Sequence, residues 1–149
     1  MIKNEIVLNA LINAGWRIGR QISRDSFVEI LHSEGYETSK CVIDFLEEFG
    51  GLTIFFKNLR NGLEDDDINF DIEHATHIEN SERILEDYGL RIGKKLCLIG
   101  TAYRDHFCLV MSDDGSVYGG YSDFLCKIGD SGIQAIEAIL LDYTFEEIP

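Results

Sequence analysis

The sequence predicts an α+β fold in which helices pack on one largely antiparallel sheet, within a single domain covering residues 1–149. Two patterns carry this prediction. Amphipathic segments with helical spacing fill the first third of the chain, whereas the continuous apolar runs Leu96–Tyr103 and Phe107–Met111 are typical of strands buried on both faces. A chain of 149 residues is also long enough to bury roughly 70% of its unfolded surface in one core.

The first three predicted helices have recognisable boundaries. Residues 3–14 place their apolar side chains on one helical face, and Gly15 ends that helix. Ser26 and Glu29 are spaced as a capping box for a second helix, which stops near Gly35. Ser39 is the expected N-cap of the third helix, which ends at two consecutive glycines.

The glycine pair Gly50-Gly51 predicts a corner between this helix and a strand. Either glycine can take the left-handed conformation that ends a helix at little steric cost. Leu52–Phe56 follows at once and is β-branched and aromatic enough to be the strand. Lys57–Gly62 is then expected to be a turn, and Ile68–Ile72 alternates as another strand.

The second half of the chain predicts mainly strands between two helices. A short helix is expected from about Ser81 to Tyr88, capped by Asn80 or Ser81 and ended by Gly89. Asp113-Asp114-Gly115 is a hairpin signal that joins the second apolar run to Ser116–Tyr121. Residues 132–142 supply the last helix.

Acidic residues are concentrated in one segment. The chain carries a formal net charge of −14, and residues 64–87 supply −9 of it through ten acidic residues and one arginine. The simplest interpretation is a solvated acidic loop. Such charge repels nucleic acid and anionic membranes but attracts a basic protein partner. The candidate partner-binding residues in this segment are Glu64, Asp65, Asp66, Asp67, Asp71 and Glu73.

Three aromatic residues form a second candidate contact region. Tyr118, Tyr121 and Phe124 flank glycines and small polar residues after the Asp114-Gly115 hairpin. Aromatic side chains with small polar neighbours are frequent at protein interfaces. The alternative is that Tyr118 and Phe124 are ordinary sheet residues. Both interpretations are open at this point.

The sequence favours neither a metal site nor catalysis. Cys41, Cys97, Cys108 and Cys126 lack short-spaced pairs and lie in apolar runs, so we expect buried thiols rather than zinc ligands or disulfides. His106 is two residues from Cys108, but an apolar strand would raise the pKa of that thiol rather than activate it. No nucleophile elbow, phosphate-binding glycine loop or zinc-protease motif is present, and we expect no catalytic residue and no cofactor.

Two metal patterns are incomplete. His74 and His77 could bind a transition metal from one side of a helical turn, although histidines in a polar segment are usually solvated. Asp65, Asp67, Asn69 and Asp71 share the spacing of a calcium loop, but Phe70 and Thr76 replace its glycine and its bidentate glutamate. No segment approaches the ~20 apolar residues of a membrane span, so a cytoplasmic protein is expected.

A joint pattern of glycines and aromatics resembles the third group of the SUKH superfamily of bacterial immunity proteins. The matching positions extend from about Ala10 to Leu141 and include Trp16, Gly19, Phe45, Phe49, Gly50, Gly51, Asp114 and Gly115. These are residue types of a scaffold. One departure is Leu98, where related sequences often carry proline, and we expect Leu98 to allow a more regular strand.

The resemblance implies a function that composition alone does not give. It implies a non-catalytic α+β protein that binds and neutralises a toxin made by the same bacterium or its kin. Many such toxins act on nucleic acids and have basic surfaces, which the acidic character of this chain complements. The alternative is an adaptor that uses the same fold to bind cellular proteins. In either case the expected partner is a protein, with no nucleic acid and no membrane involved.

Overall fold

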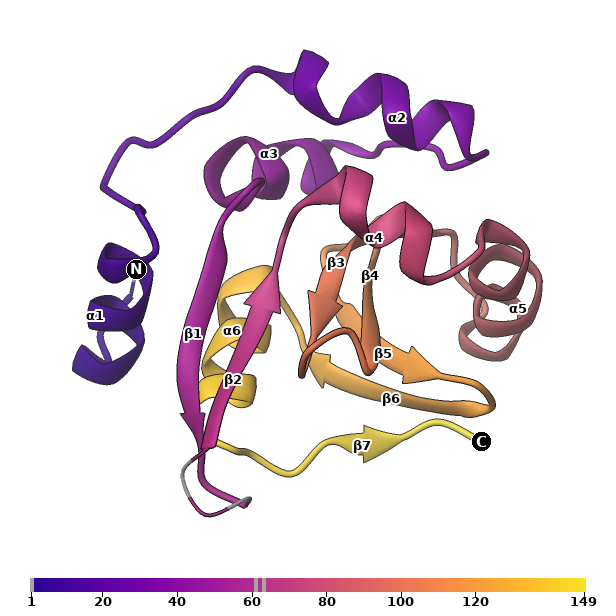
Figure 1. The fold of residues 1–149 in the computed structure, drawn as a ribbon. Helices are drawn as coiled ribbons and strands as arrows, with labels where there is room; N and C mark the ends of the chain where they lie inside the picture. The colour runs from indigo at the N-terminus through magenta and orange to yellow at the C-terminus, as the bar shows by residue number, and fades with distance from the viewer. Residues whose placement is uncertain (1, 61, 63) are drawn as a thin grey trace.

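The structure is a computed structural model that describes residues 2–60, 62 and 64–149 (Figure 1). Within these residues the strands form a seven-stranded antiparallel sheet whose spatial order is the same as the chain order. The strands are β1 (Thr53–Asn58), β2 (Glu64–Asn69), β3 (Leu96–Ala102), β4 (Phe107–Ser112), β5 (Val117–Tyr121), β6 (Phe124–Gly129) and β7 (Glu146–Glu147).

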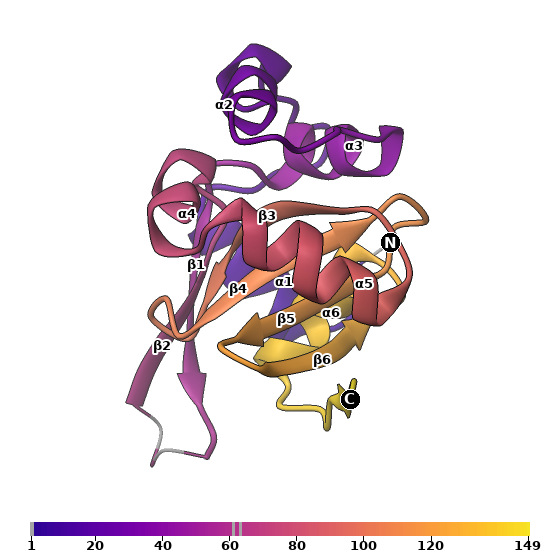
Figure 2. The same ribbon diagram turned by 90° about the vertical axis from the view of Figure 1, so that its right-hand side faces the viewer.

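Helices cover both faces of this sheet, which confirms the predicted α+β class. Figures 1 and 2 show α1 and α6 on one face, with α4 and α5 on the other and α2 and α3 stacked at one end. The helical segments are α1 (Glu5–Asn13), η1 (Arg24–Ser26), α2 (Val28–Ser33), α3 (Lys40–Phe49), α4 (Ile72–Ile78), η2 (Arg83–Tyr88), α5 (Gly89–Ile92) and α6 (Gly132–Leu140). Apolar side chains from these helices and the sheet form the core.

The corner at the end of α3 forms as predicted. Gly51 takes the left-handed conformation, with φ of 81°, while Gly50 has φ of −57° and lies so close to the helix that a Cβ would overlap the Leu46 carbonyl oxygen. The Arg20 guanidinium donates to the carbonyls of Glu48 and Gly50, the latter at 2.9 Å. These contacts satisfy carbonyls that the helix end leaves unpaired and place a cation at the negative end of the helix dipole.

Trp16 contacts the same corner. Its Nε1 donates to a carboxylate oxygen of Glu48 at 2.9 Å, and its side chain is 9% exposed. Residues near Trp16 and residues near Gly50, which are about 30 positions apart in the sequence, therefore meet at the end of α3. The predicted hairpin around Asp114 and Gly115 also forms, joining β4 to β5, and Gly115 has φ of 91°.

The acidic run is a strand and not the expected loop. Glu64 to Asn69 pairs with β1 along its whole length, from Asn58↔Glu64 to Thr53↔Asn69. Pairing with β1 overrides the low strand propensity of aspartate, and alternate residues Asp66 and Ile68 point inward and are buried. Asn61, in the predicted turn before it, lies outside the described residues.

Several details of the predicted helices and strands are wrong. The strand expected to reach Ile72 ends at Asn69, because the Asp71 side chain caps α4 by accepting the His74 N–H at 3.2 Å. The helix capped by Asn80 runs through Gly89 as η2 and α5 and ends at Gly93, which has φ of 77°. The register of β3 against β4 shifts between Leu98 and Gly100, so the strand is not more regular there.

The cysteines are free thiols. Cys97, Cys108 and Cys126 are buried, and Cys41 is half-buried. Burial raises the pKa of the Cys97 and Cys108 thiols to about 12 and that of Cys126 to about 11. The expectation that an apolar strand raises the pKa of the Cys108 thiol is therefore confirmed.

Candidate binding cleft

A cleft of about 630 Å³ lies between the β1–β2 hairpin, the turn from β3 to β4 and the segment that follows α6. Aromatic side chains line it from four elements, namely Tyr103, Phe107, Phe124 and Phe145. Charged side chains surround them, namely Arg60, Glu64, Asp65, Asp66, Arg104 and Asp142. Its volume falls within the roughly 300–1,000 Å³ of typical ligand pockets.

The aromatic side chains form a continuous row across the sheet. Ring centroids are 6.1 Å apart for Phe56 and Tyr103, 5.3 Å for Tyr103 and Phe107, and 5.2 Å for Phe107 and Tyr121. Phe124 stacks on Tyr121 at 5.3 Å and contacts Phe107 at 5.9 Å. Strand alternation explains the row, because Phe107 and Tyr121 each lie two residues from the paired residues Leu109 and Gly119.

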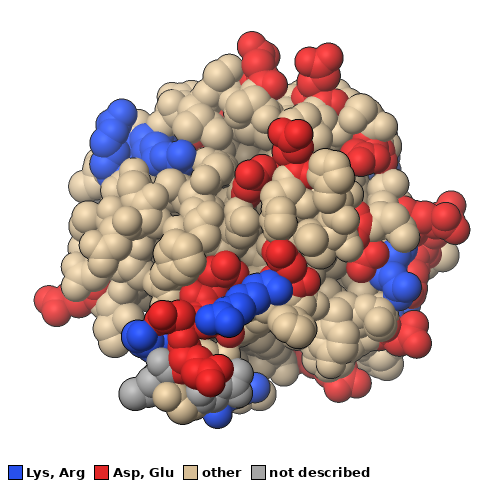
Figure 3. All heavy atoms as spheres, in the orientation of Figure 1, with Lys and Arg blue, Asp and Glu red and all other residues tan. Residues whose placement is uncertain are grey.

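The charged rim is held by pairs within the chain. Arg60 Nε lies 2.7 Å from a carboxylate oxygen of Asp142, and Lys57 Nζ lies 2.5 Å from one of Asp65. The hydrogen bond from Lys57 lowers the pKa of the Asp65 carboxyl. Figure 3 shows acidic and basic side chains side by side over the hairpin. The cleft therefore presents both charges, with carboxylates in excess.

The turn between β3 and β4 carries an unusual backbone. Tyr103, Arg104 and Asp105 have φ of 55°, 53° and 67°, so three consecutive residues other than glycine are left-handed. This conformation costs about 1–2 kcal/mol per residue for L-amino acids. It turns Tyr103 and Arg104 toward the cleft, which both of them line.

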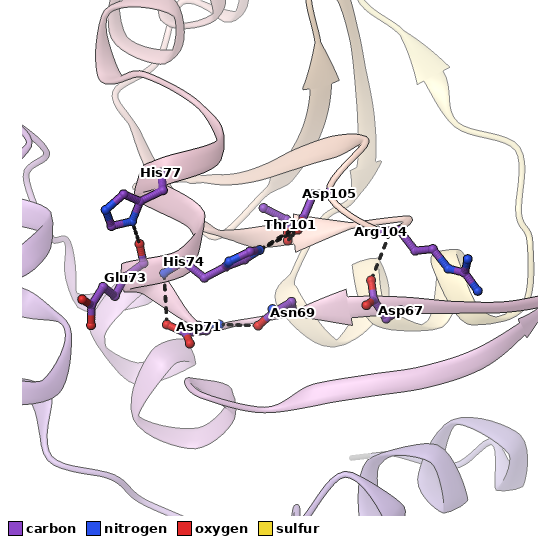
Figure 4. A network of polar contacts seen from close by, with 9 residues as sticks. All are labelled: Asp67, Asn69, Asp71, Glu73, His74, His77, Thr101, Arg104 and Asp105. Atoms are coloured by element: carbon purple, nitrogen blue, oxygen red, sulfur yellow. Dashed lines mark hydrogen bonds and ion pairs between the residues drawn. The ribbon is translucent and has the colours of Figure 1, made fainter.

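A polar network on the opposite side of the sheet holds this turn (Figure 4). The Asp105 carboxylate accepts the Thr101 hydroxyl at 2.7 Å and lies 2.9 Å from His74 Nε2 of α4. Burial alone would raise the pKa of Asp105, but the hydrogen bonds from Thr101 and His74 outweigh it and lower that pKa. The Asp67 carboxylate accepts the backbone N–H of Arg104 at 3.1 Å, and the Asp67 backbone carbonyl accepts the N–H of Tyr103 at 2.8 Å.

Left-handed residues other than glycine gather around this cleft. Among the described residues the remaining two are Asp142, with φ of 58°, and Ser122, with φ of 48°. Asp142 lines the cleft, and Ser122 lies in the turn between Tyr121 and Phe124. Backbone strain that the surrounding structure maintains is concentrated at functional sites in proteins, where it pre-organises contacts. The distribution marks this end of the sheet as the candidate site.

The structure brings only part of the predicted site together. Glu64, Asp65, Asp66 and Phe124 line the cleft, and Tyr121 borders it through its contacts with Phe107 and Phe124. Asp66 is only 9% exposed and accepts the Asn58 amide at 2.8 Å, so it has a structural role as well.

Other predicted residues lie elsewhere. Tyr118 is 4% exposed, so the alternative that it is an ordinary sheet residue holds, because strand alternation in β5 places it on the opposite face from the exposed Tyr121. Asp67 supports the strained turn, Asp71 caps α4, and Glu73 offers its backbone carbonyl to His77 at 2.7 Å.

The two metal patterns do not converge. His74 turns to Asp105 whereas His77 turns to its own helix (Figure 4). The four oxygen-bearing residues of the calcium-like spacing follow an extended strand into the α4 cap, so they do not wrap around a point. In the part of the chain that the structure describes, no group of three or more histidine, cysteine or carboxylate side chains could hold a metal ion.

Sequence patterns missed Tyr103, Arg104, Phe107, Asp142 and Phe145. Alternation along β4 could have placed Phe107 on the same face as Tyr121, had the pairing been known. The left-handed turn has no signal in sequence, because tyrosine and arginine disfavour it. Arg60 and Asp142 form an ion pair although they are 82 positions apart in the sequence, so no local pattern relates them.

Comparison with protein families gives one match: the model described as SUKH-3 immunity protein matches residues 3–142. Neither the curated proteins nor the solved structures give a match. No described helix is both long and apolar enough to span a bilayer.

Proposed function

This chain belongs to the SUKH-3 immunity protein family, and from that premise we propose that it is a bacterial immunity protein that binds a cognate toxin domain and neutralises it. The family match carries the proposal. It covers residues 3–142 of 149, which include all the residues that line the cleft except Thr144 and Phe145. We propose further that residues 1–149 act as a single, non-catalytic domain in the cytoplasm.

The proposed contact surface is the cleft with the β1–β2 hairpin beside it. A toxin that acts on nucleic acids needs a basic surface to hold phosphates, and carboxylates of the hairpin would attract that surface. Exposed aromatic rings beside the carboxylates, notably Tyr121 at 48% exposure, can then bury apolar area on contact. Occupying the basic surface would exclude the nucleic acid.

Co-expression tests the function. The toxin would be the C-terminal domain of a secreted toxin encoded beside this protein. We expect host cells to survive toxin expression only when this chain is present, and the two proteins to co-elute on size exclusion. Continued killing with both proteins soluble and no complex, repeated for every neighbouring toxin, would reject immunity and favour a cellular adaptor.

Charge substitution tests the surface. Glu64→Gln with Asp65→Asn removes two exposed charges next to the cleft, of which Asp65 pairs with the exposed Lys57. It spares Asp66, which is buried, and Asp67, which holds the β3–β4 turn. We expect association with the toxin at low salt to slow by about tenfold, with a smaller change in dissociation. The matched control is Glu82→Gln with Glu86→Gln, on the helix at the other face. Equal slowing in both variants would show that only total charge matters.

A further inference from the structure

We propose that the cleft is a receptor for an arginine side chain of the protein partner. The inference deepens the proposed function, because it names the group that the partner inserts. It rests on three observations: the cleft has an aromatic floor, its carboxylates stand at the edge of that floor, and two guanidinium groups of the chain itself already use this surface.

The floor suits a flat cation. Tyr103, Phe107 and Phe124 form one connected aromatic surface, with centroid separations of 5.3 and 5.9 Å. A guanidinium plane stacks on such rings and is attracted by their negative faces, and arginine is less strongly hydrated than lysine. An aliphatic or acidic side chain would gain little from the combination of rings and carboxylates.

Two arginines of the chain itself contact the polar edge of the cleft. Arg60 Nε donates to Asp142 at 2.7 Å, and Arg104 Nη2 donates to the Asp65 carbonyl at 2.6 Å. The Arg60 side chain remains 63% exposed, whereas Asp142 is 30% exposed. The carboxylate is therefore the more buried of the two groups and Arg60 the more exposed, so an arginine of the partner can take the place of Arg60.

The backbone supports the same assignment. Asp142 is left-handed, with φ of 58°, at the end of α6, and the turn that presents Tyr103 and Arg104 is left-handed as well. Both sides of the cleft are thus held by main-chain conformations that keep the carboxylate and the rings in place before any ligand arrives. Pre-organisation of this kind reduces the entropy lost on binding.

The test uses capped tripeptides of the form Gly-X-Gly, with X as arginine, lysine or the uncharged analogue citrulline, titrated into the full chain and followed by NMR. We expect the arginine peptide to shift signals of Phe107, Phe124 and Arg60 with a Kd of about 1 mM, and the lysine peptide to bind about tenfold more weakly. Equal binding of lysine, or of citrulline, would overturn the proposal. So would shifts confined to the acidic surface around Glu82 and Glu86.

Two variants with opposite expected effects sharpen the test. Asp142→Asn should weaken the arginine peptide by about tenfold, and asparagine tolerates the left-handed backbone there. Arg60→Ala should tighten it about threefold by removing the internal competitor. Arg24→Ala removes the same charge from an ion pair with Glu47, and neither residue lines the cleft, so it is the matched control. An equal gain in Arg24→Ala would reduce the effect to net charge and reject the proposal.

These outcomes are separable from those of the proposed function. Peptide binding does not involve a toxin, so an arginine-selective cleft in a chain that rescues no host would reject immunity alone. Rescue by wild type and by Asp142→Asn to the same extent, together with no peptide selectivity, would reject the arginine receptor alone.

Discussion

The α3 corner and the β3–β4 turn both require left-handed backbone, and they meet the requirement differently. At the corner glycine occupies the position, with Gly51 at φ of 81°, and Arg20 satisfies the helix carbonyls. At the turn Tyr103, Arg104 and Asp105 occupy it, and a network with His74, Thr101 and Asp67 holds them. Glycine thus serves where only the path of the chain matters, whereas side chains are retained where the turn faces a cleft.

The largest expected effect comes from adding a methyl group at the corner. Gly50→Ala would drive a Cβ into the Leu46 carbonyl oxygen and against Ile22. Because backbone has to move, we expect the free energy of unfolding to fall by about 3 kcal/mol. Urea unfolding would measure this. A loss below 1 kcal/mol, by the same method, would show that the corner is less rigid than described.

Removing the cation at the corner should have the next largest effect. Arg20→Ala deletes the hydrogen bonds to Glu48 and Gly50 and leaves two helix-end carbonyls to water. We expect the free energy of unfolding to fall by about 2 kcal/mol. Arg17→Ala, three residues away and exposed, is the control and should be nearly neutral. Similar losses in both would mean that the capping contacts contribute little.

The turn should respond in the opposite sense. Arg104→Gly relieves about 1–2 kcal/mol of left-handed strain. Part of this gain is offset, because glycine raises the conformational entropy of the unfolded chain and the arginine hydrogen bond is lost. We expect net stabilisation by about 0.5 kcal/mol together with weaker toxin binding. Thermal unfolding and the binding assay are measured on the same preparation. Destabilisation beyond 1 kcal/mol would contradict the idea that strain is maintained there for function.

The smallest effect is a dependence of stability on pH. The Asp105 pKa is lowered in the folded protein, so its contribution is present above the pKa of about 4 that an aspartate has in the unfolded chain, and is lost as pH falls through the folded value. We therefore expect the free energy of unfolding to fall more steeply between pH 6 and pH 3 for the wild type than for Asp105→Asn. Parallel curves would show that the network with His74 and Thr101 does not stabilise the ionised carboxylate.

Sequence patterns predict the local parts of this fold well and the non-local parts poorly. Helix α3, its glycine corner, the Asp114-Gly115 hairpin and the central strands follow from spacing and from residue types with strong conformational preferences. The acidic strand β2 could not be predicted, because aspartate disfavours strands and the pairing with β1 decides the outcome.

The cleft was predictable only in pieces. Glu64, Asp65 and Phe124 were candidates on residue type, but Arg60, Arg104 and Asp142 converge from three turns that no sequence spacing relates. Tyr118 shows the limit of residue type as evidence. It lies three residues from Tyr121 in the same strand, so strand alternation places the two side chains on opposite faces, and Tyr118 is buried whereas Tyr121 is exposed.

The order of the strands has a consequence for how the protein forms. Each strand of the sheet pairs with the one before it in the chain, from β1 to β7. Among the described strands, helices separate β2 from β3 and β6 from β7, whereas the other neighbouring strands are joined as hairpins. Most of the sheet can therefore assemble by adding each hairpin to the last, in the order in which a ribosome delivers them. Contacts that are near in sequence make folding fast.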